Sequence, residues 1–365
     1  MVRQQARRVI ARRPHHALLA VPVVLVLAIT LADLLLPNDV HLGPLLVAAP
    51  TITASFAGAL LTAGVGVLAL LCQALIGANE GSLDNQGTQS QLIAVAVVTV
   101  FVVVFRVLRD RDQRRLIQVR SVAATAQRAL LRPLPARVGT LELASVYTAA
   151  AAEARIGGDL YGLARTGHST VIIIGDARGK GLPAVSDAAT LLGAFREAAR
   201  RGPTLPDLAA DLDESLRASL DIDDTHPEPA ETFVTALLLE FPDDAPTCIM
   251  VNCGHPPPLL AHGGAITSLD ADHYALPLGL GTLGNGAARA ETFAFHPGDV
   301  LLLYTDGVIE ARDRSGAFYP LAERAAKAPH DTPGALVAHL NDDLTRYTRR
   351  RLGDDAAMIA IQRHS

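Results

Sequence analysis

The chain has 365 residues, of which 50% are apolar and 4% aromatic, and its formal net charge is −5. Residues 1–120 carry 11 basic and 6 acidic side chains, whereas residues 121–365 carry 21 basic and 31 acidic ones. This arrangement excludes a purely cytosolic globule and argues against nucleic acid as a partner, because the acidic part would repel phosphates. The three cysteines, which stand at unrelated spacings, form neither a disulfide framework nor a zinc site.

The first 108 residues are predicted to form a helical membrane domain. A helix needs roughly 20 apolar residues to cross the bilayer, and residues 17–36 and 91–108 supply about that length. Residues 42–78 contain no charged side chain. This stretch is long for one transmembrane helix and short for two. Both cytoplasmic candidates, the N-terminal tail and the exit after residue 108, are rich in arginine, so the positive-inside rule requires an even number of crossings. We therefore expect four transmembrane helices, at about 17–36, 42–55, 56–78 and 91–108, with a re-entrant segment at 42–78 as the alternative.

The predicted outer loops, residues 37–41 and 79–90, contain acidic residues but no Lys or Arg. They are too short for a sensor domain, so any sensing by this part must take place within the bilayer. Asp33 lies about one turn from the predicted outer surface, and we favour a side chain that extends to the interface over a functional intramembrane carboxylate. A cleaved signal peptide fits residues 1–36 less well than a transmembrane helix does, because the first apolar run is long and lacks a small-residue cleavage site.

Residues 109–132 are predicted to form a connector helix that ends before Pro133. Apolar residues recur on it at alternating spacings of three and four, as in a coiled-coil seam: Leu116, Val119, Ala123, Ala126 and Leu130. Two heptads do not establish a dimer. A homodimer through this helix and packing of the stripe on the helix's own domain are therefore both open.

Residues 133–365 are predicted to form an α+β domain. Short apolar runs alternate with turn residues, as strands do, and two helical stretches lie between them. Strands gathered with two long helices indicate a layered fold. The expected strands are Thr170–Ile174, Phe233–Glu240, Cys248–Val251, Val300–Tyr304 and Ala356–Ile361, and the expected helices are Leu182–Arg201 and Leu205–Leu220.

Aspartates stand at the ends of these strands, beside glycines. Asp159 lies in IGGDLYG, Asp176 follows VIIIG, Asp306 follows LLLYT, and Asp354 and Asp355 precede the last strand. Each alone is an ordinary turn residue, so the prediction rests on the set. Two carboxylates about 4 Å apart repel by about 4 kcal/mol at an effective dielectric near 20, and a cluster of four therefore requires cations. Oxygen ligands without His or Cys favour Mg²⁺ or Mn²⁺.

Several blocks in order make the sequence resemble one family. ARIGGDLYGL, IGDARGKGLPAV, VNCGHPPPLL, GDVLLLYTDGVIEARD and GDDAAMIAI closely resemble bacterial metal-dependent phosphatases of the stage II sporulation protein E (SpoIIE)/RsbU type, which are relatives of protein phosphatase 2C. The resemblance covers about residues 127–362. It implies a protein phosphatase 2C-like α-β-β-α sandwich over residues 133–365, behind the N-terminal helical transmembrane bundle.

The resemblance also implies a site with two Mn²⁺ or Mg²⁺ ions. In this site Asp176 would bridge both metals, next to the backbone carbonyl of Ala177, and Asp159 would be a ligand of the second metal. Asp306 and Asp354 would be ligands of the first metal, whereas a direct role of Asp355 is less expected. A water shared by the metals would become acidic, and the resulting hydroxide would attack phosphorus in line.

The sequence departs from the family pattern at two places. Protein phosphatase 2C itself has Asp-Gly-His at the bridging carboxylate, but here Arg178 stands in place of the histidine that is proposed as general acid. Arg178 and Lys180 are candidates to contact the substrate phosphate, or they are solvent-facing loop residues. Gly162 stands where many relatives have a second Asp, and we expect little effect from this change.

Two residues that look reactive are interpreted as structural. His255 precedes three prolines in GHPPP, which make a rigid turn, and the family gives it no ligand role. Cys253 lacks the base and the electropositive pocket that a nucleophilic thiol needs.

The expected function is therefore that of a protein phosphatase at the lipid bilayer. It would be a multi-pass protein of the inner (cell) membrane, with its phosphatase domain in the cytoplasm. Its substrate would be a phosphorylated regulatory protein, and the resemblance points to an anti-anti-sigma factor. Two alternatives are a catalytically silent signalling or binding module and a phosphatase of small phosphate esters.

Overall fold

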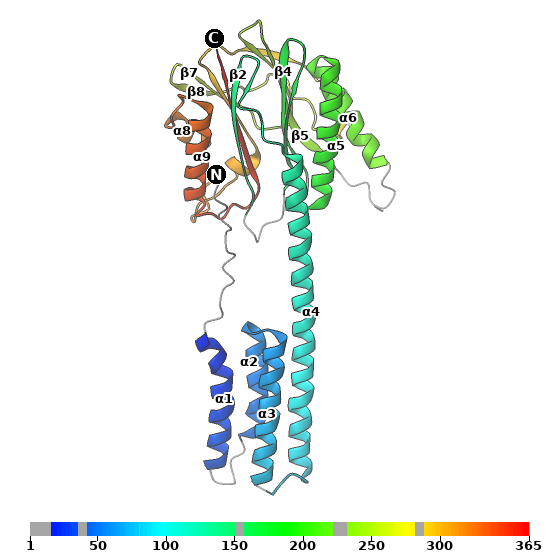
Figure 1. Cartoon of the computed structure of the whole chain (residues 1–365), viewed down its shortest axis with the longest axis vertical. Helices are drawn as coiled ribbons and strands as arrows, with labels where there is room; N and C mark the ends of the chain where they lie inside the picture. Colours follow the sequence, from blue (N-terminus) through cyan, green and yellow to red (C-terminus); the bar gives the residue numbers. More distant parts are fainter. Residues whose placement is uncertain are drawn as a thin grey trace, which may run out of the picture. The chain divides into compact units, whose positions relative to one another are not determined.

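The computed structural model describes residues 16–35, 42–79, 81–150, 157–221, 232–281 and 288–364. These residues form two compact units, Met1–Gln118 and Val119–Ser365 (Figure 1).

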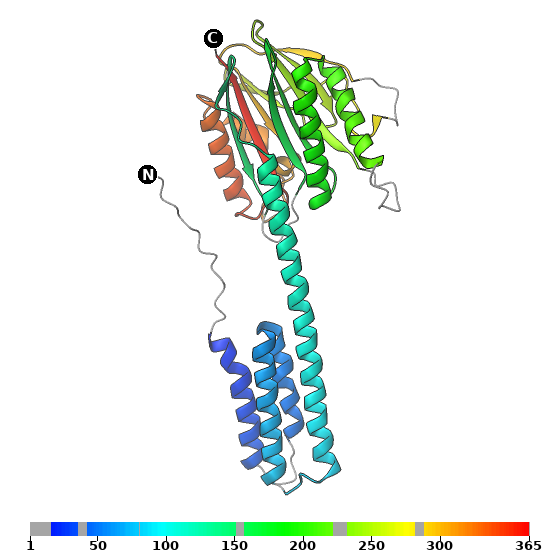
Figure 2. The ribbon, with the colours of Figure 1, turned by 45° about the vertical axis from the view of Figure 1, so that its right-hand side comes forward.

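The first unit consists of helices that lie side by side (Figure 2). Among the described residues, two stretches are long and apolar enough to cross a membrane, Ala59–Asn79 and Gln86–Arg114, and two shorter apolar helices cover Ala20–Leu35 and Gly43–Phe56. Four complete crossings stay a prediction. The helices are α1 (His16–Leu35), η1 (Gly43–Val47), α2 (Ala48–Phe56), α3 (Ala59–Asn79) and the first part of α4 (Gln86–Leu130).

Large apolar side chains are exposed along these helices, among them Leu60, Leu71 and Phe101. In a protein surrounded by water alone, an apolar surface of this extent is unusual. Such a surface is typical of helices that face lipid.

The second unit contains two antiparallel sheets. In the first, the strand order is β1-β2-β11-β10-β7-β8, and in the second it is β3-β4-β5-β6-β9. The first sheet comprises β1 (Arg137–Val138), β2 (Leu141–Thr148), β7 (Leu259–His262), β8 (Ala265–Ser268), β10 (Val300–Tyr304) and β11 (Ala356–Arg363). The second comprises β3 (Asp159–Arg165), β4 (Ser169–Ala177), β5 (Val234–Pro242), β6 (Thr247–Cys253) and β9 (Glu291–Ala294).

Helices cover the outer face of each sheet (Figure 1). The second sheet packs against α5 (Leu182–Ala198) and α6 (Leu205–Asp221), with η2 (Ala199–Arg201) between them, and the first sheet against α8 (Leu321–Ala326) and α9 (Pro333–Tyr347). The short helix α7 (Asp306–Ile309) follows β10. This is the predicted α+β fold, an α-β-β-α sandwich.

Strand β4 shows why the central strands read as continuous apolar runs. Ile172 and Ile174 lie in the core between the two sheets, whereas Val171 and Ile173 lie in the core formed with α5 and α6. Since successive side chains of a strand point to opposite faces, a strand with a core on both faces needs apolar residues at every position.

The end of the connector belongs to the second unit. Helix α4 ends at Leu130, whose half-buried side chain packs on the core of this unit. The side chains of Leu116, Val119, Ala123 and Ala126 lie outside the described residues, and the coiled coil stays a prediction.

Candidate active site

The pairing of β3 with β4 brings the first two aspartates together. Asp159 and Asp176 are directly opposite each other in the antiparallel register, where side chains start about 5 Å apart. Asp159 is only 2% exposed. Burial raises the pKa of Asp159 well above its usual range, and the charge of Asp176 raises it further.

Asp306 and Asp354 approach this pair from the other sheet. Asp306 begins α7 directly after β10, Asp354 precedes β11, and these two strands are antiparallel neighbours. The pKa of Asp176 is raised to about 7 by burial, with further contributions from the charges of Asp306 and Asp354. The pKa of Asp306 is raised by burial and then by Glu310 and Asp354. The four predicted carboxylate ligands therefore form one cluster of repelling charges.

The backbone beside the cluster needs glycine. The amide of Ala177 donates to the carbonyl oxygen of Gly158 at 3.2 Å. A Cβ atom at position 158 would lie 2.5 Å from the carbonyl oxygen of Ala177, so any residue other than glycine would collide with this oxygen. The oxygen belongs to the predicted backbone ligand. The donor set is entirely oxygen and fits hard divalent ions such as Mg²⁺ and Mn²⁺.

Asp355 has a different place from its neighbour Asp354. It is buried, and its carboxylate accepts hydrogen bonds from the hydroxyl of Tyr147 at 2.5 Å and from the amides of Ala150 and Gly157 at 2.7 and 2.9 Å. Its oxygens thus hold Tyr147, Ala150 and Gly157 beside the start of β11.

The two residues predicted to contact the substrate phosphate, Arg178 and Lys180, have different surroundings in the structure. The ammonium of Lys180 lies 2.5 Å from Asp354 Oδ2, and this carboxylate is the main cause of the raised pKa of Lys180. Arg178 is also exposed, but its guanidinium lies over the ring of Phe233, 5.1 Å from the ring centre. Lys180 therefore borders the carboxylate cluster, whereas Arg178 packs on an aromatic side chain.

Gly162 faces away from the cluster. A Cβ atom there would lie 3.1 to 3.4 Å from side-chain atoms of Leu192, Ile173 and Phe195, on the face of β3 that packs against α5. Because strand side chains alternate, Asp159 and residue 162 point to opposite faces. The departure at Gly162 therefore removes no carboxylate from the cluster.

Thr305 is a site residue that the sequence did not single out. Its buried hydroxyl donates to Asp159 Oδ2 at 2.9 Å and accepts from the amide of Ala357 at 3.0 Å. It thus connects β3 to β10 and β11 and orients Asp159. The only sign of this role in the sequence is that a threonine precedes Asp306 in YTDG. An ordinary turn residue is equally common at such a position, so the pattern alone does not identify a site residue.

Replacing Thr305 with valine is expected to weaken Mn²⁺ binding by roughly tenfold, the effect of removing a hydrogen bond that orients a metal ligand. Valine keeps the shape of threonine but leaves Asp159 and the Ala357 amide without this partner. Isothermal titration with Mn²⁺ measures the change, and Thr305→Ser, which keeps the hydroxyl, should bind as wild type. Equal affinities of the valine and serine variants would contradict the assigned role.

Gln127 is a second contact that the sequence did not reveal. This buried residue near the end of α4 donates from Nε2 to the carbonyl oxygen of Gly157 at 3.2 Å. The last turns of α4 therefore hold the segment that leads to Asp159.

His255 and Cys253 are structural, as expected. His255 Nε2 donates to the carbonyl oxygen of Tyr304 at 3.1 Å, and burial lowers the pKa of His255 to about 4. Asn252 bonds both the amide and the carbonyl of His255. Burial raises the pKa of the Cys253 thiol to about 12, which excludes a thiolate nucleophile at neutral pH.

Protonation of His255 should contribute a destabilising effect of acid on the second unit, opposite in sign to the effect of Asp176 and Asp306, whose pKa values are raised. The folded state keeps this imidazole neutral, so below the ordinary pKa of about 6.5 the unfolded state takes up a proton that the folded state does not. Between pH 7.5 and pH 5 this lowers the free energy of unfolding by about 2 kcal/mol. Urea unfolding at the two pH values should show that His255→Gln loses this difference and that the exposed-site control His339→Gln keeps it. The same acid sensitivity in His255→Gln and wild type would refute the assignment.

Comparison with known proteins agrees with the sequence resemblance. The family model of Stage II sporulation protein E (SpoIIE) matches residues 166–364. The solved RsbU and RsbW domains of Rv1364c from Mycobacterium tuberculosis are 25% identical, with a TM-score of 0.52, over 64% of this chain and 61% of that chain. This chain therefore spans less than two thirds of that solved chain.

The SiaA-PP2C domain of Pseudomonas aeruginosa is 18% identical, with a TM-score of 0.56, over 70% of this chain and 99% of that chain. At this identity it shows the fold alone, and the fold is the one predicted. The family match covers most of the second unit and includes Asp176, Asp306 and Asp354. The chain belongs to the SpoIIE family of PP2C-type phosphatases.

Proposed function

We propose that this protein is a membrane-anchored phosphatase that uses two Mn²⁺ or Mg²⁺ ions to hydrolyse phosphoserine or phosphothreonine on a cytosolic regulatory protein. PP2C-family phosphatases use divalent metals such as these. The proposal rests on the cluster of four aspartates that the two sheets bring together, Asp159, Asp176, Asp306 and Asp354.

The side chains around the cluster have separate tasks in this function. Divalent ions held by the four carboxylates and the carbonyl of Ala177 would acidify a water molecule and neutralise the phosphate. Thr305 fixes the orientation of Asp159 by its hydrogen bond. Lys180, beside Asp354 at the exposed rim, is placed to attract the phosphate dianion.

We infer that the substrate is a phosphoprotein, with a phosphorylated anti-anti-sigma factor as the specific candidate. Homologues act on phosphorylated regulatory proteins such as those of sigma-factor pathways. Residues 121–365 carry more acidic than basic side chains, which disfavours capture of small anionic esters. A binding module without catalysis would have no use for four repelling carboxylates.

The test uses the full-length protein in lipid nanodiscs with Mn²⁺, with Mg²⁺ or with EDTA. Phosphate release is compared on a phosphorylated anti-anti-sigma factor, on p-nitrophenyl phosphate and on a sugar phosphate. We expect metal-dependent release that is fastest on the phosphoprotein. Faster turnover of the sugar phosphate would favour the small-ester phosphatase, and no turnover despite bound metal would favour the binding module.

We further propose that the first unit anchors the protein in the cell membrane as a multi-pass domain, with the second unit in the cytoplasm. The two long apolar helices support insertion, and the arginines at positions 3–13 and 106–115 support the orientation. The apolar residues Leu116, Val119, Ala123 and Ala126 of the connector support a homodimer, whereas Leu130 packs on its own unit.

A further inference from the structure

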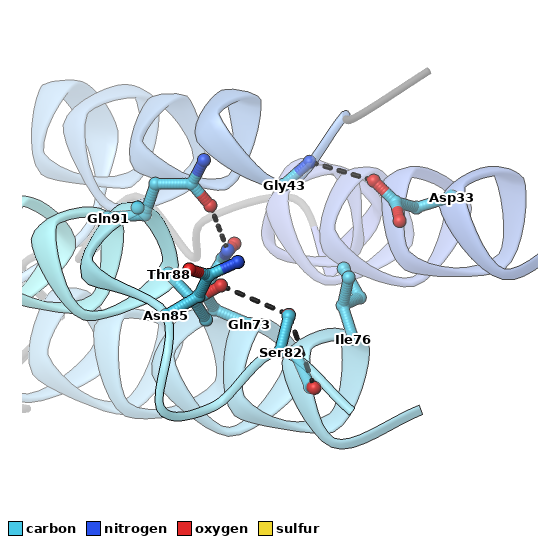
Figure 3. Close-up of a pocket in the computed structure, with 10 residues that line it drawn as sticks. Asp33, Gly43, Gln73, Ile76, Ser82, Asn85, Thr88 and Gln91 are labelled. Atoms are coloured by element: carbon cyan, nitrogen blue, oxygen red, sulfur yellow. Dashed lines mark hydrogen bonds between the residues drawn. The ribbon is translucent and has the colours of Figure 1, made fainter. Parts of the chain in front are cut away.

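The first unit contains a polar pocket among its apolar helices. Its volume is about 320 Å³, and it is lined by residues of α1, η1, α3, the α3–α4 loop and the start of α4. Figure 3 shows the polar side chains that surround it. Pockets of about this volume are at the lower end of the range for small-molecule sites.

Gln73 brings an unsatisfied acceptor into this pocket. The residue is 2% exposed, and its Nε2 donates to Gln91 Oε1 at 2.7 Å. Its Oε1 atom is buried and has no hydrogen-bond partner among the described residues. A Cβ atom on Gly43 would lie 2.7 Å from this amide, so glycine makes the room that the amide occupies. A buried acceptor of this kind is costly unless a donor reaches it.

Asp33 brings a negative charge into the same pocket. It is 8% exposed, and its Oδ2 accepts from the amides of Leu42 at 2.6 Å and Gly43 at 2.9 Å. The side chain is therefore turned into the unit, where backbone amides bind it, and its position at the membrane interface stays a prediction. The amides of Leu42 and Gly43, at the start of η1, meet the carboxylate inside the unit. Both hydrogen bonds go to one carboxylate oxygen, Oδ2.

The charge and the hydrogen-bonding groups of the pocket define the ligand class. Among the described residues that line the pocket, Asp33 is the only charged one, and none is Lys, Arg or His. The lining also offers hydroxyl and amide groups from Ser82, Asn85 and Thr88. A negative site with an unsatisfied acceptor suits a small cation that donates N–H bonds, which an ammonium group with three donors provides.

We propose that this pocket binds a small primary ammonium compound, whose N–H groups donate to Asp33 and to Gln73 Oε1. The positive-inside rule predicts that the α3–α4 loop, which contributes Ser82 and Asn85, faces the outside. The first unit is then a ligand-binding domain as well as an anchor.

The test uses n-butylammonium as probe and full-length protein in nanodiscs, with saturation-transfer NMR as the readout of binding. Butyltrimethylammonium has the same charge but no N–H donor. We expect n-butylammonium to bind at least roughly tenfold more tightly than this analogue, and Asp33→Asn to weaken its binding by at least roughly tenfold, because charge-assisted hydrogen bonds are lost in both cases. Asp84→Asn removes an exposed acidic charge from the same loop and should bind as wild type.

Gln73→Met provides a second variant, because it removes the acceptor without changing the charge of the pocket. Gln73→Met should weaken n-butylammonium binding. It therefore tests the proposal even if Asp33→Asn does not fold. Equal binding of the two ammonium ions, or equal binding by wild type and Gln73→Met, would overturn the proposal. Displacement of the probe by K⁺ at equal concentration would indicate a site for inorganic cations, and no saturable binding would indicate a pocket that holds only water.

Discussion

Replacing Asp176 with asparagine is expected to abolish metal-dependent phosphate release and, at the same time, to stabilise the metal-free protein. The carboxylate stands among three others, so its loss removes a metal ligand and a source of repulsion together. The loss of metal-supported charge stabilisation should lower the rate by roughly 10³-fold or more. Less repulsion should raise the free energy of unfolding in EDTA by about 1–2 kcal/mol. Phosphate release and urea unfolding, each with Mn²⁺ and with EDTA, measure the two effects.

Asp355→Asn is the matched control for this experiment. Asp355 is also buried, but it accepts hydrogen bonds from three donors. Its replacement should lower stability with and without Mn²⁺, because amide nitrogen cannot accept these bonds. The two variants should therefore change the stability of the metal-free protein in opposite directions. If Asp176→Asn keeps its turnover, or gains as much stability from Mn²⁺ as wild type, the cluster is not the metal centre.

The central strands were predictable because a strand with a core on each face needs an uninterrupted apolar run. Expected strand Thr170–Ile174 lies within β4, and expected strand Val300–Tyr304 coincides with β10. The aspartates that follow these runs had to lie at strand ends, so their candidate role was accessible from the sequence. The short strands β7 and β9, of four residues each, lack such a run, and they were not predicted.

The interactions that complete the site depend on register and on contacts between distant segments, which no local pattern encodes. The Thr305 hydroxyl reaches Asp159 only because the end of β10 lies beside the start of β3, although the two strands belong to different sheets. Gln127 meets Gly157 only because the last turns of α4 pack within the second unit. The position of Asp33 depends on the backbone amides of Leu42 and Gly43, which bind its carboxylate from the next element. In each case hydropathy predicted the element and left the partner of its polar side chain undefined.

Gly307→Ala is expected to destabilise the second unit by about 3 kcal/mol, the upper part of the range for overpacking, and to disrupt the metal centre. Gly307 lies in α7, where helix propensity alone would favour alanine by about 1 kcal/mol. The methyl group, however, would lie 1.8 Å from the carbonyl oxygen of Asp355. This oxygen is backbone and is held by the start of β11, so α7 must move away. That movement separates Asp306 from Asp354, and the collision therefore outweighs the propensity.

Gly193→Ala separates the two effects, because Gly193 lies inside α5 and a Cβ atom there has no neighbour within 4 Å. This control should stabilise the protein by up to about 1 kcal/mol, the difference in helix propensity. Pulse proteolysis of the full-length protein in urea compares both variants with wild type, and Mn²⁺ titration reports on the site. A stability gain in Gly307→Ala like that in Gly193→Ala would mean that the β10–α7 turn can move without cost. Asp306 would then not be held in place by its contact with β11, and the cluster would depend on the pairing of β3 with β4 alone.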